Sequence, residues 1–370
     1  MKPPPSHTRV VIVGAGYAGA ATAWAIGRIG LGPGVILEQE SSYGYHASGR
    51  NAAIFRVAEE DPTILTLALR SLDHIRRLES SGGPLLNPTG GLTLAGAGAA
   101  GELHQLASKL NQRGLHVELL TLPVARDRFP LLRLVRFHEA LWCEEEAIAD
   151  IHALLTFYIQ QARATGFELH TNCRADDLIV SQGRVTGVRT SAGDIAADAV
   201  IDASGAWAGR LGRGAAPLPL RALRRHLFVF GPPTGGHHDS PFAWVQDAGF
   251  YFRPEGDGLL MSPCDETLMV PCEPPTDPAA AELLAEKLSA HAPAFTDLPL
   301  RRSWACLRTF SPDRHPFIGA DPARPGLYHL SGLGGFGMTT SAAVGELMAE
   351  ILAGRTPDWI DVAQMAVGRF

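Results

Sequence analysis

The segment SWACLRTFSPDRHPFIGA, residues 303–320, carries side chains that could do chemistry. It places Cys306 and Arg308 two residues apart in a turn-rich, polar run that apolar residues bracket. The planar guanidinium of an arginine can bind a carboxylate through two parallel hydrogen bonds, and a cysteine beside a positive charge can react as the thiolate. Taken alone, Arg308 also suits a surface ion pair and Cys306 a small core residue. The segment therefore raises a carboxylate-binding hypothesis that other residues have to support.

A glycine-rich motif near the N-terminus predicts a dinucleotide-binding site. The motif comprises Gly14, Ala15, Gly16, Tyr17, Ala18 and Gly19. It follows the β-branched run RVVIV and precedes small residues at helical spacing, and Glu38 ends the next expected strand about twenty residues on. The helix N-terminus would offer N–H groups to phosphates, and Glu38 would accept hydrogen bonds from a ribose diol. The alternative is a glycine turn that binds no ligand.

A further glycine cluster near the C-terminus favours a flavin over a nicotinamide cofactor. Gly332, Gly334, Gly335 and Gly337 precede a helix that we expect to begin near Thr339. The N-terminus of a helix can stabilise the negative charge that a reduced flavin carries at N1 and C2=O. A glycine-rich connection without a ligand is the alternative here.

The composition is that of an ordinary globular protein, with 46% hydrophobic and 19% charged residues in a chain of 370. A net charge of −6 without a basic stripe argues against nucleic-acid binding. Five scattered cysteines without CxxC spacing argue against a disulfide framework or a zinc site. No signal peptide and no apolar run of membrane-spanning length is recognised, so we expect a cytoplasmic protein. Because adjacent histidines point apart, no metal site is expected at His237, His238 and Asp239.

The order of expected elements predicts an α/β fold (α+β overall) with a Rossmann-type domain built from separated segments. Strand, turn and helix occupy residues 9–30, Asp61 caps a helix over residues 62–79, and antiparallel strands cover residues 220–270 before a helix capped by Asp277. We assign to the FAD-binding domain residues 1–80, 145–215 and 306–370, and to an antiparallel-sheet substrate domain residues 81–144 and 216–305. Ligands commonly bind in a cleft between such domains.

Together these motifs resemble the D-amino-acid oxidase superfamily of FAD enzymes, which includes glycine oxidase, sarcosine oxidase and D-amino-acid dehydrogenases. The resemblance covers nearly the whole chain. It rests on VIVGAGYAGAATA, on GYHASGRNAA at residues 44–53, on ADAVIDASGAWAG at 197–209, and on LRTFSPDRHPFIG and GLGGFGMTTSAAVGE within 307–346. The bacterial D-arginine dehydrogenase group shares the further stretches RRHLFVF and GFYFRP.

The resemblance implies FAD as the cofactor and a set of residues around it. Glu38 would hold the adenosine ribose, and Ser48, Arg50 and Asn51 would lie beside the pyrophosphate and flavin, at the start of a helix that HASGRNAA opens. The other contacts that the resemblance implies are Gln39, Gly49, Ala52, Ala53, Arg174, Ala175, Ser204, Gly205, Trp207, Gly334, Gly335, Phe336, Gly337, Met338 and Thr339.

The resemblance also implies that Arg308 pairs with the substrate carboxylate in front of the flavin, with further contacts from Arg225 and Tyr251. The positions that would contact an arginine side chain are occupied differently in this chain. They hold Phe242, Trp244, Ile54 and Met338, with Arg56 and Glu59 nearby. Aromatic and branched residues form a poor site for a guanidinium. We therefore expect an apolar or aromatic substrate side chain, unless Phe242 and Trp244 are merely core residues.

The sequence leaves the flavin linkage and the electron acceptor open. In sarcosine oxidases a cysteine six residues before a Pro-Asp pair is joined to the flavin, and Cys306 has this spacing. A lysine near the flavin often assists reaction with oxygen, but Lys2, Lys109 and Lys287 fall in elements that we expect to lie elsewhere. This favours a dehydrogenase that uses a quinone over an oxidase that uses O2, although His226 or an arginine could replace the lysine.

We therefore expect FAD-dependent oxidation of an amino acid, inferred from the family to be a D-amino acid, by hydride transfer from Cα to flavin N5. The imino acid would hydrolyse to a 2-keto acid and ammonia, and no residue stands out as a general base. The alternatives are oxidation of sarcosine, another N-methyl amino acid or a 2-hydroxy acid, and a flavin-bound assembly protein without turnover. Arg308 and Tyr251 speak against the last alternative, since a scaffold has no need of them.

Overall fold

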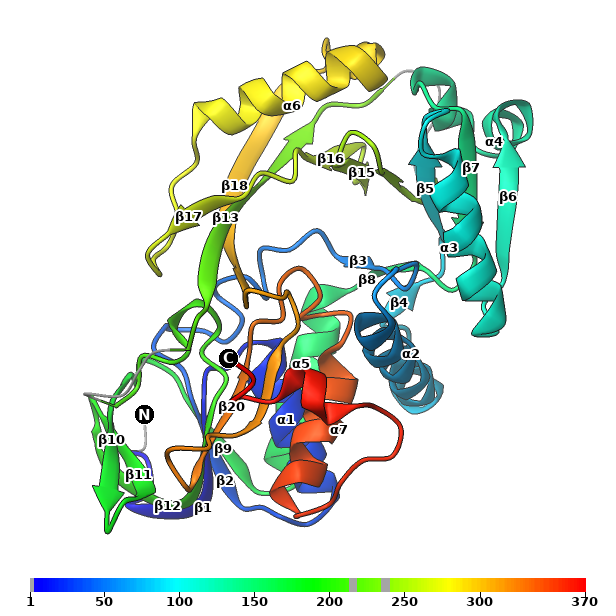
Figure 1. The fold of residues 1–370 in the computed structure, drawn as a ribbon. Coiled ribbons are helices and arrows are strands. Elements are labelled where there is room, and N and C mark those ends of the chain that lie inside the picture. Colours follow the sequence, from blue (N-terminus) through cyan, green and yellow to red (C-terminus); the bar gives the residue numbers. More distant parts are fainter. Residues whose placement is uncertain (1–2, 213–217, 234–239) are drawn as a thin grey trace.

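The structure is a computed structural model that describes residues 3–212, 218–233 and 240–370. An α/β part contains a mainly parallel sheet, and a β-rich part contains a large, mostly antiparallel sheet (Figure 1). Each sheet is assembled from segments far apart in the sequence, because the chain passes between the parts several times. The predicted mixed α/β fold is confirmed.

The α/β part has a parallel core of strands formed by continuous apolar runs, which suit strands buried on both faces. These strands are β1 (His7–Val13), β2 (Gly34–Leu37), β9 (Phe167–His170), β12 (Gly193–Asp202) and β20 (Leu327–Ser331). They lie in the order β20–β12–β1–β2–β9. Antiparallel strands extend the sheet, namely β10 (Ala175–Ser181), β11 (Arg184–Thr190) and β19 (Phe317–Ala320).

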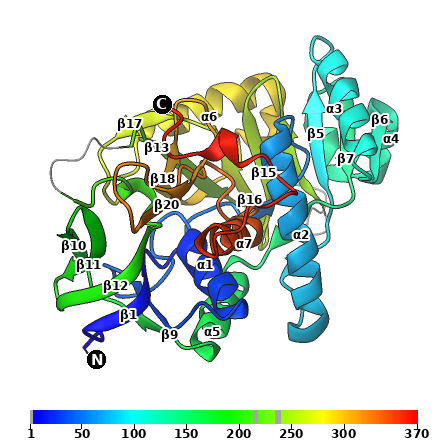
Figure 2. The ribbon, with the colours of Figure 1, turned by 60° about the horizontal axis from the view of Figure 1, so that its bottom comes forward.

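Helices pack against this sheet and against one another. They are α1 (Tyr17–Arg28), α5 (Ile151–Ala164) and α7 (Ser341–Leu352), with α2 (Pro62–Gly82) alongside α7 (Figure 2). The cap predicted for α2 is confirmed, because Asp61 accepts hydrogen bonds from the N–H groups of Thr63 and Ile64, both at 2.9 Å. Short 3-10 helices occur at Pro130–Leu134, Gly205–Trp207, Pro293–Phe295 and Val362–Met365.

The β-rich part is built on strands drawn mainly from the middle of the chain. They are β5 (Gly91–Ala95), β6 (Val117–Thr121), β7 (Glu139–Cys143), β13 (Arg221–Phe230), β14 (Phe242–Val245), β15 (Phe250–Glu255), β16 (Gly258–Ser262), β17 (Thr267–Met269) and β18 (Leu300–Phe310). Helix α6 (Pro278–His291) covers the outer face, where Leu284 packs with Phe228, Phe250 and Phe252 (Figure 1). Helices α3 (Ala100–Gln112) and α4 (Leu122–Arg128) lie beside β5, β6 and β7.

The pairing of β13 with β18 decides which side chains face the α/β part. Arg225 lies opposite Cys306, and Leu223 lies opposite Arg308. Side chains alternate between the faces of a strand, so Arg225, Cys306 and Arg308 share one face. Cys306 packs there with Tyr251 and with Ala52 of the α/β part, which identifies this as the inner face.

A small sheet of β3 (Ile54–Phe55), β4 (Leu86–Asn87) and β8 (Ala147–Ala149) joins the two parts. The prediction of a helix at HASGRNAA is wrong, because residues 43–49 form turns that lead into β3. Asn51 competes with a helix through its side chain, donating to the carbonyl of Ser48 and accepting from the N–H of Ala53, both at 2.7 Å. The C-terminal helix begins later than expected, at Ser341, after further turns.

The described ranges contain neither a candidate metal site nor a candidate membrane-spanning helix. No group of three or more His, Cys, Asp or Glu side chains in them is placed to hold a metal ion. His237, His238 and Asp239, where the sequence predicts no metal site, lie outside the described residues. Among the helices described, none combines the length and apolarity needed to cross a membrane.

Candidate active site

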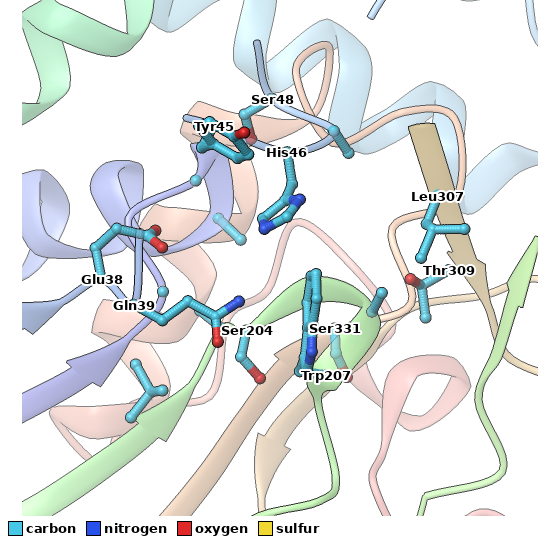
Figure 3. Close-up of a pocket in the computed structure, with 18 of the residues that line it drawn as sticks. Glu38, Gln39, Tyr45, His46, Ser48, Ser204, Trp207, Leu307, Thr309 and Ser331 are labelled. Carbon is cyan, nitrogen blue, oxygen red and sulfur yellow. The ribbon is translucent and has the colours of Figure 1, made fainter. Parts of the chain in front are cut away.

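A first cavity lies where the glycine motif turns from β1 into α1 (Figure 3). Gly14 has a φ of +106°, and a Cβ there would lie 2.5 Å from the carbonyl oxygen of Ala203. A Cβ on Gly19 would lie 1.9 Å from the carbonyl oxygen of Gly14, and one on Gly16 would lie 2.8 Å from Oγ of Ser48. No side chain therefore fits at these three positions, and the turn keeps the bare backbone that a pyrophosphate site requires.

Glu38 directly follows β2 and faces the same cavity (Figure 3). Its Oε2 accepts a hydrogen bond from the N–H of Ala15 at 3.1 Å, and its Oε1 accepts one from the N–H of Glu40 at 3.0 Å. Burial raises the pKa of Glu38, while these hydrogen bonds oppose the shift. The carboxyl group is thus held rigidly at the cavity, where it can accept hydrogen bonds from ligand hydroxyls.

Most residues expected to contact FAD line this cavity, and the rest lie in other places. Those that line it are Gly14, Gly16, Tyr17, Ala18, Glu38, Gln39, Ser48, Arg50, Arg174, Ala175, Ser204, Gly205, Trp207, Gly334 and Gly337. Those that line a second cavity instead are Asn51, Ala52, Gly335, Phe336, Met338 and Thr339. The expected residues outside both linings are Ala15, Gly19, Gly49 and Ala53.

The first cavity also has walls that the sequence did not indicate. His46 enters it and packs on Trp207, with 4.6 Å between ring centroids, and Leu307, Thr309 and Ser331 line it as well (Figure 3). His46 belongs to the HASG stretch, which could have pointed to it. The other three residues stand on β18 and β20, whose approach to the glycine motif depends on tertiary packing.

A segment of the β-rich part borders the first cavity and is hydrogen-bonded to residues of its wall. Arg50 donates to Oε1 of Glu273 at 2.5 Å, and the hydroxyl of Tyr45 donates to its Oε2 at 3.1 Å. Cys272 and Pro274, the neighbours of Glu273, line the cavity. The guanidinium of Arg50 is therefore engaged by a carboxylate in this structure.

The second cavity, of about 550 Å³, lies against the inner face of the β-rich sheet. This volume is in the usual range for small-molecule sites. The residues that line both cavities are Tyr17, Ala47, Ser48, Cys306, Gly334 and Gly337. The cavities therefore adjoin, and a cofactor in the first would meet a small ligand in the second.

Arg308 and Tyr251 come together in the second cavity from β18 and β15. Nη2 of Arg308 lies 3.4 Å from the hydroxyl oxygen of Tyr251. Arg308 is half-buried, and within the described residues no acidic side chain pairs with it. A Cβ on Gly335 would lie 2.6 Å from Nη1, so the glycine loop packs closely on the guanidinium. Because buried charges in proteins normally have a partner, this cation is suited to an anionic group of a ligand.

Arg225 also lines the second cavity, but it already has partners. Its Nη2 lies 3.1 Å from Oε1 of Glu266, and its Nε donates to the carbonyl of Asp265 at 2.9 Å. Its predicted role as a further carboxylate contact stays a prediction, and in this structure it shares the carboxylate of Glu266 with Arg314.

The residues expected to form the substrate pocket are brought together around the second cavity. Phe242, Trp244, Ile54 and Met338 all line it. The indole ring of Trp244 stacks on the ring of Tyr251, with 6.0 Å between centroids. Phe242 and Trp244 therefore face the cavity as well as the core, and their contact with a substrate stays a prediction.

The expectation that Lys287 lies away from the site was wrong, and His226, which could have replaced a lysine there, lines neither cavity. Lys287 lines the second cavity, where its Nζ donates to the carbonyls of Gly249 and Pro263 at 2.9 and 2.8 Å. Burial lowers the pKa of Lys287. His226 is fully buried among Asp265 and Asp277 and lines neither cavity. Lys2 lies outside the described residues, and the position of Lys287 gives no argument for a dehydrogenase over an oxidase.

Cys306 lies where the cavities meet, only 3% exposed. Burial raises the pKa of its thiol, and the positive charges of Arg308 and Arg225 oppose the shift without reversing it. The neutral thiol is therefore favoured over the nucleophilic thiolate.

Glu146 is buried beside the second cavity and was not indicated by the sequence. Its Oε1 accepts hydrogen bonds from the N–H groups of Val57 and Ala58 at 3.0 and 2.8 Å, and its Oε2 has no partner among the described residues. Burial raises the pKa of Glu146 from its ordinary 4.5 to about 7, although Arg56 opposes the shift.

Replacing Glu146 by glutamine is expected to stabilise the protein above pH 7. The folded state binds a proton at Glu146 more tightly than the unfolded chain does. This contribution is full below about pH 4.5 and is lost as the pH rises to about 7. Glu146→Gln keeps the acceptor for Val57 and Ala58 and removes the ionisation, a gain of up to about 3 kcal/mol at pH 8. The melting temperatures of the two proteins, compared from pH 5 to 8, should diverge as the pH rises; parallel curves would show that Glu146 titrates normally.

Comparison with known proteins places the chain in a family. The sequence pattern described as DAO, FAD dependent oxidoreductase, matches residues 9–351. Mouse mitochondrial sarcosine dehydrogenase is 25% identical over 96% of this chain, which spans only 41% of that relative. A D-amino acid dehydrogenase of Bradyrhizobium diazoefficiens is 27% identical over 64% of this chain and 55% of the relative. L-proline dehydrogenase from P. horikoshii has the same fold, with a TM-score of 0.88 at 20% identity, covering 99% of this chain and 98% of that one.

The glycine cradle and the carboxyl group at the end of β2 fit an FAD molecule, and the family match extends over both parts of the fold. The chain belongs to the DAO family of FAD-dependent oxidoreductases, and FAD is its cofactor.

Proposed function

We propose that this protein oxidises a D-amino acid with an apolar or aromatic side chain to the imino acid, which water hydrolyses to a 2-keto acid and ammonia. The observation that carries the proposal is Arg308, a cation without an acidic partner in the described residues, facing a cavity that adjoins the FAD site. Amino acids and 2-hydroxy acids share the carboxylate that such a group would bind.

The residues of the chain would bind and orient the substrate. Arg308 would hold the carboxylate through its planar fork, and Tyr251 would donate its hydroxyl proton to the same group. Fixing the carboxylate orients the Cα–H bond toward the first cavity, which brings the reacting atoms together. When bound there, FAD supplies the acceptor for the two electrons and the hydrogen that leave Cα.

The side-chain preference and the stereochemistry are parts of the same proposal. Ile54, Phe242, Trp244 and Met338 surround the space beyond Arg308 with apolar surface, which supports an apolar or aromatic substrate. The likeness to D-amino-acid dehydrogenases supports the D configuration. The likeness to sarcosine dehydrogenase makes N-methyl amino acids the second candidate substrates.

Anaerobic bleaching of the yellow holoenzyme tests the proposal without any assumption about the electron acceptor. The panel contains D- and L-amino acids, N-methyl amino acids and 2-hydroxy acids. We expect D-amino acids with apolar or aromatic side chains to bleach the flavin fastest. If no amine bleaches it, the proposed reaction is wrong, and bleaching by 2-hydroxy acids alone would assign a different substrate class.

We further expect FAD to be released when the protein is denatured. The raised pKa of Cys306 disfavours the thiolate that covalent attachment needs. After acid precipitation the yellow colour should remain in the supernatant, and Cys306→Ala should bind FAD with unchanged stoichiometry. Colour that stays in the pellet of the wild type but not of Cys306→Ala would establish covalent attachment instead.

A further inference from the structure

An ion pair lines the second cavity together with the apolar residues. Arg56 and Glu59 follow β3, and Nη1 of Arg56 lies 3.1 Å from Oε1 of Glu59. Their side chains are 19% and 15% exposed, and both line the cavity. Burying an ion pair costs free energy unless its polar atoms have hydrogen-bond partners. A polar atom of the pair without such a partner therefore indicates where a ligand could bind.

One carboxylate oxygen of Glu59 is buried without a hydrogen-bond donor. Within the described part of the chain, its Oε1 makes only the ion-pair contact with Arg56. Arg56 directs its Nη2 to the carbonyl of Ala58 at 3.0 Å, which leaves that nitrogen less available to Glu59. Glu59 therefore offers acceptor capacity in the cavity.

The aromatic rings of the pocket connect Arg308 to this ion pair. The hydroxyl of Tyr251 contacts Arg308, the ring of Tyr251 stacks on Trp244, and the guanidinium carbon of Arg56 lies 4.9 Å from the centroid of Trp244. A substrate held by its carboxylate at Arg308 would extend its side chain along this aromatic wall toward Glu59.

The charges around Glu59 favour a neutral group over a charged one. Arg56 balances Glu59, and burial raises the pKa of the nearby Glu146 to about 7, so that this group carries only part of its charge near neutral pH. A cationic side chain would meet Arg56, and an anionic one would meet Glu59, so each would be opposed by a like charge. A neutral N–H or O–H donor would satisfy the carboxylate without this repulsion.

We propose that the preferred substrate carries an aromatic side chain with a neutral hydrogen-bond donor at its far end, which donates to Glu59, the phenol of tyrosine being the simplest case. The proposal rests on the proposed function and specifies its substrate. It makes Glu59 a specificity-determining residue and Arg56 the group that positions it.

Tyrosine and phenylalanine form a matched pair that differs by the one hydroxyl. We expect the rate constant of anaerobic flavin reduction divided by the apparent Kd to be about 10- to 100-fold higher for D-tyrosine than for D-phenylalanine. In the double variant Arg56→Met/Glu59→Leu, which removes the pair together and keeps the apolar lining, this ratio should fall to about one. Glu59→Gln, which keeps an acceptor, should retain part of the preference, and the exposed neighbour variant Glu60→Gln should behave as wild type.

A ratio near one in the wild type, or an unchanged ratio in the double variant, would overturn the inference. Binding of 3-(4-hydroxyphenyl)propanoate and 3-phenylpropanoate, followed through the flavin absorbance of the oxidised holoenzyme, separates it from the proposed function. These acids lack the amine and need no turnover. Tighter binding of the hydroxyl compound, lost in the double variant, would support the role of Glu59 even if no amino acid reduced the flavin, whereas equal binding would contradict it.

Discussion

Replacing Arg308 by leucine is expected to lower kcat/KM for the amino acid substrate by about 100- to 1,000-fold. The guanidinium faces the second cavity beside Tyr251, and no acidic side chain of the described residues forms an ion pair with it. Its loss would remove the partner of the substrate carboxylate and the orientation of Cα toward the cofactor, so both binding and the rate of flavin reduction should suffer. Anaerobic reduction over a range of substrate concentrations measures the two effects separately.

Arg314 provides a matched control for the charge of Arg308. It lines the same cavity, but its side chain is 59% exposed, and its Nη2 lies 2.7 Å from Oε2 of Glu266. Arg314→Leu removes the same charge and should change kcat/KM by less than about fivefold. Arg308→Lys should be intermediate, because lysine keeps the charge but not the fork. Equal effects of the two leucine variants, each with normal FAD content, would contradict a specific carboxylate contact.

Replacing Gly14 by alanine is expected to yield protein that retains little or no FAD. The φ of +106° is one that L side chains rarely adopt, and the new Cβ would lie 2.5 Å from the carbonyl oxygen of Ala203. Backbone atoms of β1 or of the segment after β12 would have to move, and both border the cavity that receives the pyrophosphate. The ratio of flavin to protein absorbance after purification measures the effect.

Gly30→Ala separates the strain of a positive φ from the clash of a new Cβ with neighbouring atoms. Gly30 also has a positive φ, of +73°, but a Cβ added there would have no atom within 4 Å. The variant should therefore lose about 1 kcal/mol of stability and keep its FAD. If Gly14→Ala retained one FAD per protein molecule, glycine would not be required at position 14 for FAD binding.

The sequence by itself predicted the features that depend on residues close together in the chain. The strand, glycine turn and helix around Gly14, and the caps at Asp61 and Asp277, follow from local conformational preferences and short-range hydrogen bonds. The FAD family followed from motifs that are contiguous in the chain. Local signals failed at HASGRNAA, where the side-chain hydrogen bonds of Asn51 favour turns over a helix.

The candidate site was only partly predictable from the sequence. Arg308, Tyr251 and the apolar residues were predicted through the family resemblance, whereas Lys287, Glu146 and the contact of His46 with Trp207 were not. Their positions depend on how segments distant in the sequence pack. Lys287 on α6 reaches carbonyl groups of loops in the β-rich part. On β13, Arg225 lies on the inner face of the sheet and His226 on the outer face. The sequence alone therefore determined the cofactor class, because a short glycine turn and the strand after it create the dinucleotide cradle. Only the tertiary structure decided the charges around the substrate, because burial and pairing across the fold set them.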